Sequence, residues 1–168
     1  HEVFDKLPVR DESSWTSLIT SYSLDRKDTI VVDLFNQMMQ ESIHPDILTF
    51  TAVLNACSHA GLVDEGKEYF ASMTANYGII PTLEHHTCMI DLFGRAGHFD
   101  KAVEAIKRMP TLDYLPMWSS LLGSCQKWGN VEVGKLAFDH CVQLDEHNVA
   151  GYVNMRNIFA ADTALEEN

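Results

Sequence analysis

The side chains that could carry chemistry in this 168-residue chain are its histidines and cysteines, and their spacing argues against a metal centre. The run His85-His86-Thr87-Cys88 offers the nitrogen and sulfur ligands that zinc accepts. A zinc site needs a second pair of ligands at a suitable spacing, and no such pair occurs. The remaining cysteines, Cys57, Cys125 and Cys141, form no CxxC motif. We therefore expect no metal or other cofactor, and reduced, buried thiols rather than disulfides.

The sequence also lacks the motifs of the common catalytic machineries. A zinc deaminase needs an HxE element and a downstream PCxxC, because zinc activates the attacking water and the glutamate moves its protons. Neither motif is present. No serine or cysteine lies in a motif that would place a nucleophile on a strained turn beside a histidine. The chain is therefore predicted not to be an enzyme by itself, and a zinc-dependent enzyme is the most remote alternative.

A repeated helical pattern must position any functional side chain. Each copy opens with an aromatic residue or a histidine, at Trp15, Phe50, His86 and Trp118, and again at Tyr152. The intervals of 35, 36, 32 and 34 residues are typical of an α-solenoid, in which one helical pair is too small to bury its own apolar face. Because His86 shares the register of the aromatic residues, we expect its imidazole to pack inside the repeat.

Glycines mark the expected turn between the two helices of a pair. Gly61, Gly97 and Gly129 stand where the first helix should end, and glycine enters the left-handed conformation of such turns at no steric cost. Five positions later a small residue lies inside the second helix, which indicates a close helix crossing. These small residues are Gly66, Ala102 and Gly134. The first copy has Arg26 and Val31 at the two positions, so we expect a looser helical pair there.

The charge of the chain counts against nucleic-acid binding. Its 12 basic and 24 acidic residues give a net charge of −12, whereas nucleic-acid affinity comes largely from neutralising phosphates. Charge alone favours a protein-binding scaffold, although an acidic convex face can coexist with a concave binding groove.

No apolar run approaches about 18 residues, so no transmembrane helix and no membrane partner are expected. The chain begins and ends inside repeats, which suggests a fragment or a truncated product.

Several strings resemble plant pentatricopeptide repeat proteins. They are CSHAGLVDEGKEYF (57–70), LEH (83–85), MIDLFGRAG (89–97) and WSSLLGSC (118–125). The unequal intervals resemble the PLS subclass, which alternates standard, long and short repeats. The strings GNVEVG (129–134) and NIFA (157–160) resemble the E domain that follows the last repeats there. The resemblance covers essentially the whole chain and implies an all-α fold, a right-handed α-solenoid of helix-turn-helix (pentatricopeptide) repeats.

The resemblance also divides the chain into segments. Residues 1–11 would be the tail of a preceding short repeat, 12–46 a standard repeat, 47–82 a long-type repeat, 83–114 a short-type repeat, 115–148 the first helical pair of an E domain, and 149–168 an incomplete second E-domain repeat.

By the same resemblance, the function would be sequence-specific binding of single-stranded RNA, one base per repeat. The chain would serve as a site-recognition factor for organellar RNA metabolism, with C-to-U RNA editing as the process. The location would be the mitochondrion or the chloroplast. The E-like segment would dock editing partner proteins, including a deaminase domain supplied in trans.

In this family two residues of each repeat read the base, one near the start of the first helix and one at the end of the repeat. Mapped onto this chain, the pairs are Thr16 with Asp46, Thr51 with Thr82, and Thr87 with Tyr114. The first pair favours guanine in the family, whereas the code of the long-type repeat is poorly established. Tyr114 departs from the short polar or acidic residue that is usual there. The residues expected to flank the bases are Ser13, Leu48 and Glu84.

Other interpretations stay open at this point. The three threonines could simply be N-terminal helix residues, and Asp46 a helix cap. A tetratricopeptide-like scaffold for protein partners would suit the acidity and the spacing of Trp15, Leu18 and Tyr22, although intervals of 35, 36 and 32 do not fit a 34-residue repeat. A truncated repeat fragment without function would also account for the cut ends.

Overall fold

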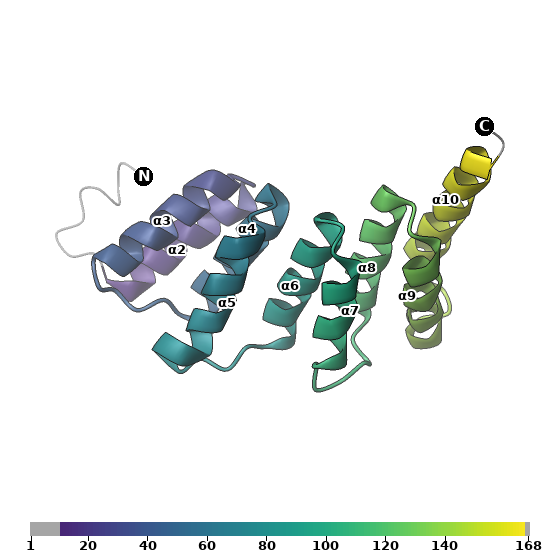
Figure 1. Cartoon of the computed structure of the whole chain (residues 1–168). Coiled ribbons are helices and arrows are strands. Elements are labelled where there is room, and N and C mark those ends of the chain that lie inside the picture. The colour runs from purple at the N-terminus through teal and green to yellow at the C-terminus, as the bar shows by residue number, and fades with distance from the viewer. Residues whose placement is uncertain (1–10, 167–168) are drawn as a thin grey trace. The chain divides into compact units, whose positions relative to one another are not determined.

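The computed structural model describes residues 11–166, and every regular element in that range is an α-helix (Figure 1). The helices are α2 (Glu12–Leu24), α3 (Asp28–Gln40), α4 (Ile47–Ala60), α5 (Val63–Tyr77), α6 (Leu83–Arg95), α7 (Phe99–Lys107), α8 (Leu115–Trp128), α9 (Val131–Leu144) and α10 (Val149–Glu166). The all-α fold class expected from the sequence is confirmed. The segment 1–10, which holds most of the expected tail of a preceding repeat, lies outside the described residues.

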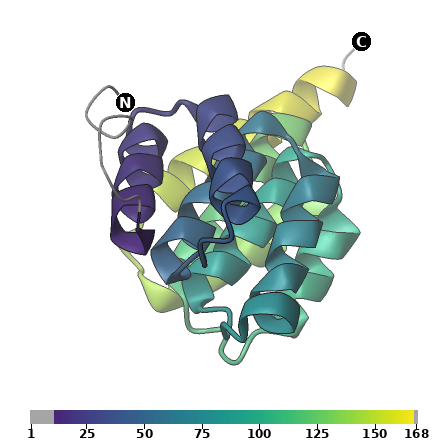
Figure 2. The same cartoon turned by 90° about the vertical axis from the view of Figure 1, so that its left-hand side faces the viewer.

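Two compact units make up the chain, and their boundary falls inside α6, between Leu92 and Phe93. In the first unit α2 packs against α3 and α4, and α4 also contacts α3 and α5 (Figures 1 and 2). In the second unit α8, α9 and α10 all contact one another. No helix in the described range is long and apolar enough to cross a membrane.

Two helix starts in the first unit are fixed by side chains that accept hydrogen bonds from otherwise unpaired backbone N–H groups. Asp11 precedes α2 and accepts from the Ser14 amide at 2.9 Å. Asp46 does the same for α4, accepting from the Thr49 amide at 2.7 Å. Such caps are worth about 1 kcal/mol each. The interpretation of Asp46 as a helix cap is therefore correct.

The turns between paired helices have the left-handed conformation that the glycines predict. Gly61, Gly97 and Gly129 have φ angles of +72°, +78° and +65°. Arg26 adopts the same conformation, with φ +58°, although a side chain there costs about 1–2 kcal/mol. Val31, the other departure of the first copy, is completely buried, so the core of this pair accommodates the larger side chain.

The core follows the expected register at three of its five positions, and Tyr152, which opens the fifth copy, is 48% exposed. Trp15, Phe50 and Trp118 are at most 3% exposed. His86, in the same register, is only half-buried and packs edge-on against Phe70, with ring centroids 5.2 Å apart. The fully buried imidazole belongs instead to His85. The expectation for His86 was therefore wrong in degree, because the preceding histidine faces α4 and finds hydrogen-bond partners there.

All four cysteines are free and buried, as expected. Burial raises the pKa of Cys57, Cys88 and Cys125 to about 12, so these thiols stay protonated at neutral pH. Within residues 11–166 no three His, Cys, Asp or Glu side chains are grouped as metal ligands.

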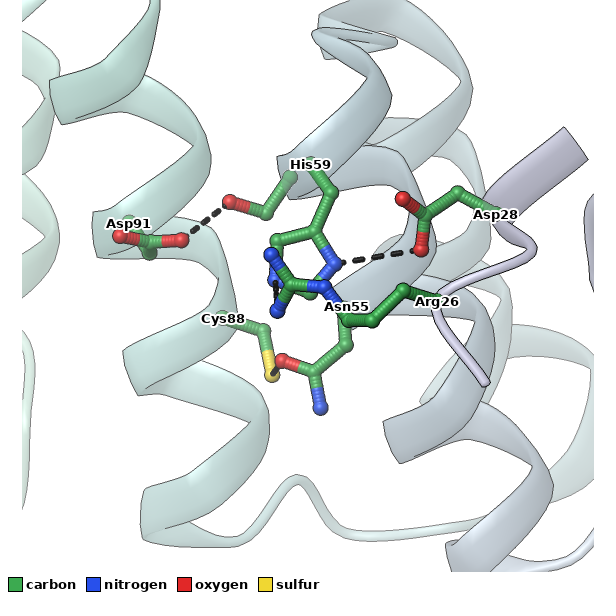
Figure 3. A network of polar contacts seen from close by, with 7 residues as sticks. Arg26, Asp28, Asn55, His59, Cys88 and Asp91 are labelled. Atoms are coloured by element: carbon green, nitrogen blue, oxygen red, sulfur yellow. Dashed lines mark hydrogen bonds and ion pairs between the residues drawn. The ribbon is translucent and has the colours of Figure 1, made fainter. Parts of the chain in front are cut away.

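Polar side chains in the C-terminal half of α4 contact residues about one repeat earlier and one repeat later in the sequence (Figure 3). His59 contacts Arg26 through Nε2 at 3.0 Å and Asp28 through Nδ1 at 3.2 Å. On the other side of α4, the Ser58 hydroxyl donates to the Asp91 carboxylate at 2.5 Å. The Cys88 thiol donates to the Asn55 side-chain oxygen at 3.1 Å. These contacts fix α4 against the turn before α3 and against α6.

Close helix crossings explain the small residues inside the helices. A Cβ added at Gly66 would lie 2.5 Å from Cδ2 of Leu92, and one at Gly134 would lie 2.9 Å from Cδ1 of Ile158. The close crossing predicted at both positions is confirmed. The tightest contact to another residue's Cβ occurs at Gly94 in the second unit, where the added Cβ would lie 2.8 Å from Cβ of Ser124. This crossing is not among those that the sequence pattern predicts.

We predict that Gly94→Ala lowers the free energy of unfolding by about 1–3 kcal/mol, because α6 and α8 must separate to admit the new methyl group. Gly123→Ala is the matched control in the same unit, since nothing lies within 4 Å of its added Cβ. It should raise the free energy of unfolding by about 1 kcal/mol, because alanine is the better helix former. Urea denaturation followed by circular dichroism measures both. Equal effects at the two positions would contradict the close crossing.

Candidate nucleic-acid interface

The starts of α2 and α4 enclose a hollow of about 520 Å³. Its lining residues are Asp11, Glu12, Ser13, Thr16, Ser17, Asp46 and Leu48. Four of the residues that the sequence analysis assigned to base reading and base flanking, Ser13, Thr16, Asp46 and Leu48, therefore meet at one place in the first unit. Leu48 is 59% exposed, so it offers an apolar surface at the rim.

Thr16 and Asp46 are in direct contact. The Thr16 hydroxyl donates to Oδ2 of Asp46 at 3.2 Å and lies 2.9 Å from the Thr49 hydroxyl. Thr49 donates both its amide and its hydroxyl to Oδ1 of Asp46, each at 2.7 Å. Thr16 and Thr49 carry one hydroxyl hydrogen each, and both hydrogens are used among the side chains of Thr16, Thr49 and Asp46. The hydroxyl hydrogens point into the cluster, and what remains for a ligand is hydrogen-bond acceptors.

The second predicted pair, Thr51 and Thr82, is joined through the ring of His85. The Thr51 hydroxyl lies 3.1 Å from Nε2 of His85, and the Thr82 hydroxyl lies 2.7 Å from Nδ1. The Thr82 amide donates to the same Nδ1 at 3.1 Å, and Nε2 lies 3.1 Å from the Ile47 carbonyl. Burial lowers the pKa of His85 below its usual value of 6.5, although the contact with Ile47 and the charge of Glu84 act in the opposite direction.

The third predicted pair is divided between the units. Thr87 lies in the first unit, where its hydroxyl donates to the Leu83 carbonyl at 2.8 Å. Tyr114 lies in the second unit and precedes α8 without a side-chain cap. Glu84, the remaining flanking residue, is exposed in the first turn of α6. The structure thus brings the first and second pairs together and describes the members of the third pair separately.

The threonines are not helix caps. Thr16, Thr51 and Thr87 each lie one turn inside their helix. The hydroxyls of Thr51 and Thr87 donate to the backbone carbonyl four residues earlier, which is an interaction of the helix interior. The capping interpretation is therefore wrong for the threonines.

Thr49 and His85 were not predicted as site residues, yet they make hydrogen-bond contacts with the side chains of the first and second pairs. Each is the third residue of its helix, and each is fully buried. The signal was present in the spacing, because Asp46 and Thr49, like Thr82 and His85, are three positions apart at a helix start, as in a capping box. The aromatic register drew attention to His86 instead.

The comparisons with known proteins identify the repeats. The PPR repeat family matches residues 10–77, and the PPR repeat matches residues 84–114, which together cover more than half of the chain. The chain belongs to the pentatricopeptide repeat (PPR) family. The PPR protein At4g14820 of Arabidopsis thaliana is 42% identical over 166 residues, which cover 99% of this chain and 23% of that protein. The PPR protein CRR2, chloroplastic, of the same plant is 41% identical over 98% of this chain and 25% of its own length.

Solved PPR structures share the fold. The PPR protein PPR10 from maize superimposes with a TM-score of 0.70 at 22% identity, over 95% of this chain and 23% of its own. PPR10 in complex with an 18-nt psaJ RNA element gives a TM-score of 0.68 at 21% identity, over 89% of this chain and 23% of its own. The expected fold of PPR helical repeats is confirmed. The chain spans about a fifth to a third of the length of the curated PPR relatives that it matches.

We predict that the free energy of unfolding of this PPR chain falls as the pH is lowered through 6.5, in part because of His85. Its pKa is lowered in the folded state, so the unfolded chain binds the proton more readily and gains stability relative to the native state as the pH falls. Burial lowers the pKa of His86 as well, so part of the slope should remain in His85→Gln. Urea denaturation between about pH 5.5 and 7.5 tests this; identical slopes for wild type and His85→Gln would contradict it.

Proposed function

We propose that this chain binds single-stranded RNA at the helix starts that carry the paired polar residues. One observation supports the proposal above the others: Thr16 and Asp46, which come from successive helical pairs, touch each other inside an open hollow. A solved structure with the same fold, that of PPR10 in complex with an 18-nt psaJ RNA element, agrees with this class of ligand. The bases of single strands offer their Watson–Crick edges to such a surface, whereas those of a duplex do not.

The hydrogen-bond directions at the first pair favour guanine. With the Thr16 hydrogen turned inward, the Thr16 hydroxyl and the Asp46 carboxylate present an oxygen acceptor each. The Watson–Crick edge of guanine carries two neighbouring donors, N1–H and the N2 amino group, which match two acceptors. Adenine and cytosine each place a ring acceptor beside a single amino group, and uracil places its one N–H between two carbonyls. Leu48 and Ser13 would flank the base, and only Leu48 adds an apolar contact.

The finer assignments are part of the same proposal. Residues 12–46, 47–82 and 83–114 would be standard, long-type and short-type repeats of the PLS subclass, and the segment from 115 onward would be an E domain. The second and third base-reading pairs would be Thr51 with Thr82 and Thr87 with Tyr114. The cellular process would be C-to-U editing in a mitochondrion or chloroplast. The name of CRR2, which carries the word chloroplastic, agrees with an organellar location.

The second unit suits protein partners better than RNA. Several large apolar side chains are between 40% and 52% exposed there: Trp128, Leu136, Tyr152, Val153 and Phe159. A hollow of about 680 Å³ between α7 and α9 adds Phe99 and Val103, with the carboxylates of Asp100, Glu104 and Glu132 in its lining. Exposed apolar surface rimmed by charge is typical of protein interaction sites. This surface would dock editing partners, including a deaminase domain supplied in trans, or, in the alternative, the partners of a general scaffold.

We predict saturable binding of a single-stranded RNA oligonucleotide, followed by fluorescence anisotropy at low salt. The affinity should fall as salt rises, because binding releases counterions from phosphates. A duplex of the same sequence should bind more weakly, since its base edges are already paired. Equal affinity for the duplex, or no binding by a protein shown to be helical, would contradict the RNA proposal and favour the protein scaffold.

We also predict that Asp46→Asn changes the preferred base from guanine to adenine at one position of the RNA. The amide of asparagine can donate to N1 of adenine, while the Thr16 oxygen accepts from the adenine amino group. The preference should change by about tenfold or more, the discrimination typical of a two-bond base contact. Asparagine caps helices as well as aspartate does, so the fold should be kept.

Asp33→Asn is the matched control, because it makes the same change of charge at an exposed position of α3. It should leave the base preference unchanged. If Asp46→Asn bound RNA with the wild-type preference, the assignment of the first pair would be wrong.

A further inference from the structure

The ring of His85 is bonded on both sides, and its partners determine which nitrogen carries the hydrogen. The Ile47 carbonyl, 3.1 Å from Nε2, can only accept, so Nε2 must be protonated. The Thr82 amide, 3.1 Å from Nδ1, can only donate, so Nδ1 must be bare. His85 is completely buried and its pKa is lowered, both of which favour the neutral ring. The surroundings therefore select one neutral tautomer.

This tautomer dictates how the neighbouring hydroxyls are turned. Nδ1 has no hydrogen, so the Thr82 hydroxyl, 2.7 Å away, must donate to it. The Thr51 hydroxyl donates its one hydrogen to the Ile47 carbonyl at 3.0 Å. Its oxygen lies 3.1 Å from Nε2, so Thr51 can only accept the hydrogen bond from the Nε2–H group. Both hydroxyl hydrogens are thus committed inside the protein. Thr82 is exposed and Thr51 is half-buried, so their free lone pairs remain accessible.

We propose that His85 is a positioning residue that turns Thr51 and Thr82 into a pair of acceptors and so makes the long-type repeat read guanine. This inference rests on the proposed binding of single-stranded RNA. A threonine hydroxyl on its own can donate or accept, and two free threonines would distinguish bases poorly. With both hydrogens held by His85 and Ile47, the pair offers acceptors alone, which match the two neighbouring donors of guanine.

The first pair, Thr16 and Asp46, is also ordered by a buried polar side chain, which there is Thr49 in place of a histidine. Thr49 is the third residue of α4, as His85 is of α6, and it orders Thr16 and Asp46 as His85 orders Thr51 and Thr82. In the second unit the third residue of α8 is Met117, which is fully buried and has no polar group to offer an equivalent contact. Of the helix starts at α4, α6 and α8, the first two therefore carry a polar third residue that contacts a base-reading pair.

The tautomer is tested first, on the whole chain without RNA. Long-range ¹H–¹⁵N correlation spectra of the histidine rings at pH 7.5, assigned by comparison with His85→Gln, should show His85 with a bare Nδ1 and a protonated Nε2. A charged ring, or a hydrogen on Nδ1, would overturn the inference.

Base reading is tested with sixteen oligouridine strands in which two adjacent central positions are varied. The wild-type chain should bind the strand with guanine at both positions about tenfold more tightly than strands with one guanine. Asp46→Asn identifies the position that the first pair reads, and the other position then reports on Thr51 and Thr82. Guanine preference at the first position with none at the second would overturn this inference and leave the proposed function standing. No binding to any strand would overturn both.

Variants separate positioning from simple packing. His85→Met removes both ring contacts at similar length and should abolish guanine preference at the second position alone. His85→Gln, which keeps an acceptor and a donor on one planar group, should restore it at least in part, and His86→Gln should change nothing. If His85→Met weakened all sixteen strands equally, His85 would be merely structural. Should His85→Met not fold, Thr82→Val takes its place, because it deletes one acceptor and leaves the His85 ring intact.

Discussion

Every feature of this chain depends on one constraint: a single helical pair cannot bury its own apolar face, so consecutive pairs must stack. Trp15, Phe50 and Leu92 are fully buried, and Phe50 packs against Phe35 of the preceding pair with ring centroids 5.3 Å apart. Close crossings at Gly66 and Gly94 draw the helices together where side chains would keep them apart. The proposed base-reading pairs depend on this arrangement, because their second members, Asp46 and Thr82, end one repeat and lie directly before the first helix of the next.

Stacking also sets the polar chemistry of the site. Hydroxyl groups beside a packed helix start must satisfy their hydrogens, since an unpaired buried donor costs free energy. Asp46, the Ile47 carbonyl and His85 accept these hydrogens from inside, and the oxygen lone pairs are what the surface retains. An acceptor-rich surface on a chain of net charge −12 attracts base donors and repels phosphates. For the proposed RNA ligand, affinity would consequently be modest and selectivity would come from the base edges.

The sequence predicts the fold well because its signals are local. The left-handed turns at Gly61, Gly97 and Gly129 and the small residues at the crossings follow from backbone and packing rules that need no knowledge of the partner helix. The site is predicted less completely. Which of His85 and His86 is buried depends on the direction in which α6 faces α4, and a repeat interval does not resolve one residue. Trp128 shows the same limit: its indole donates to the Arg95 carbonyl at 3.2 Å, a contact set by the tertiary arrangement of its own unit.

The turn at Arg26 differs from the glycine turns in what it requires. A glycine adopts the left-handed conformation unaided, so its turn forms from its own helical pair. Arg26 is held there with its guanidinium against His59 of the next pair, and His59 also contacts Asp28 just beyond the turn. Part of the strain at Arg26 is thus offset only when the following pair is folded. Local opening of α4 would release this turn as well, so the first two repeats are coupled into one cooperative unit more tightly than a chain of independent glycine turns would be.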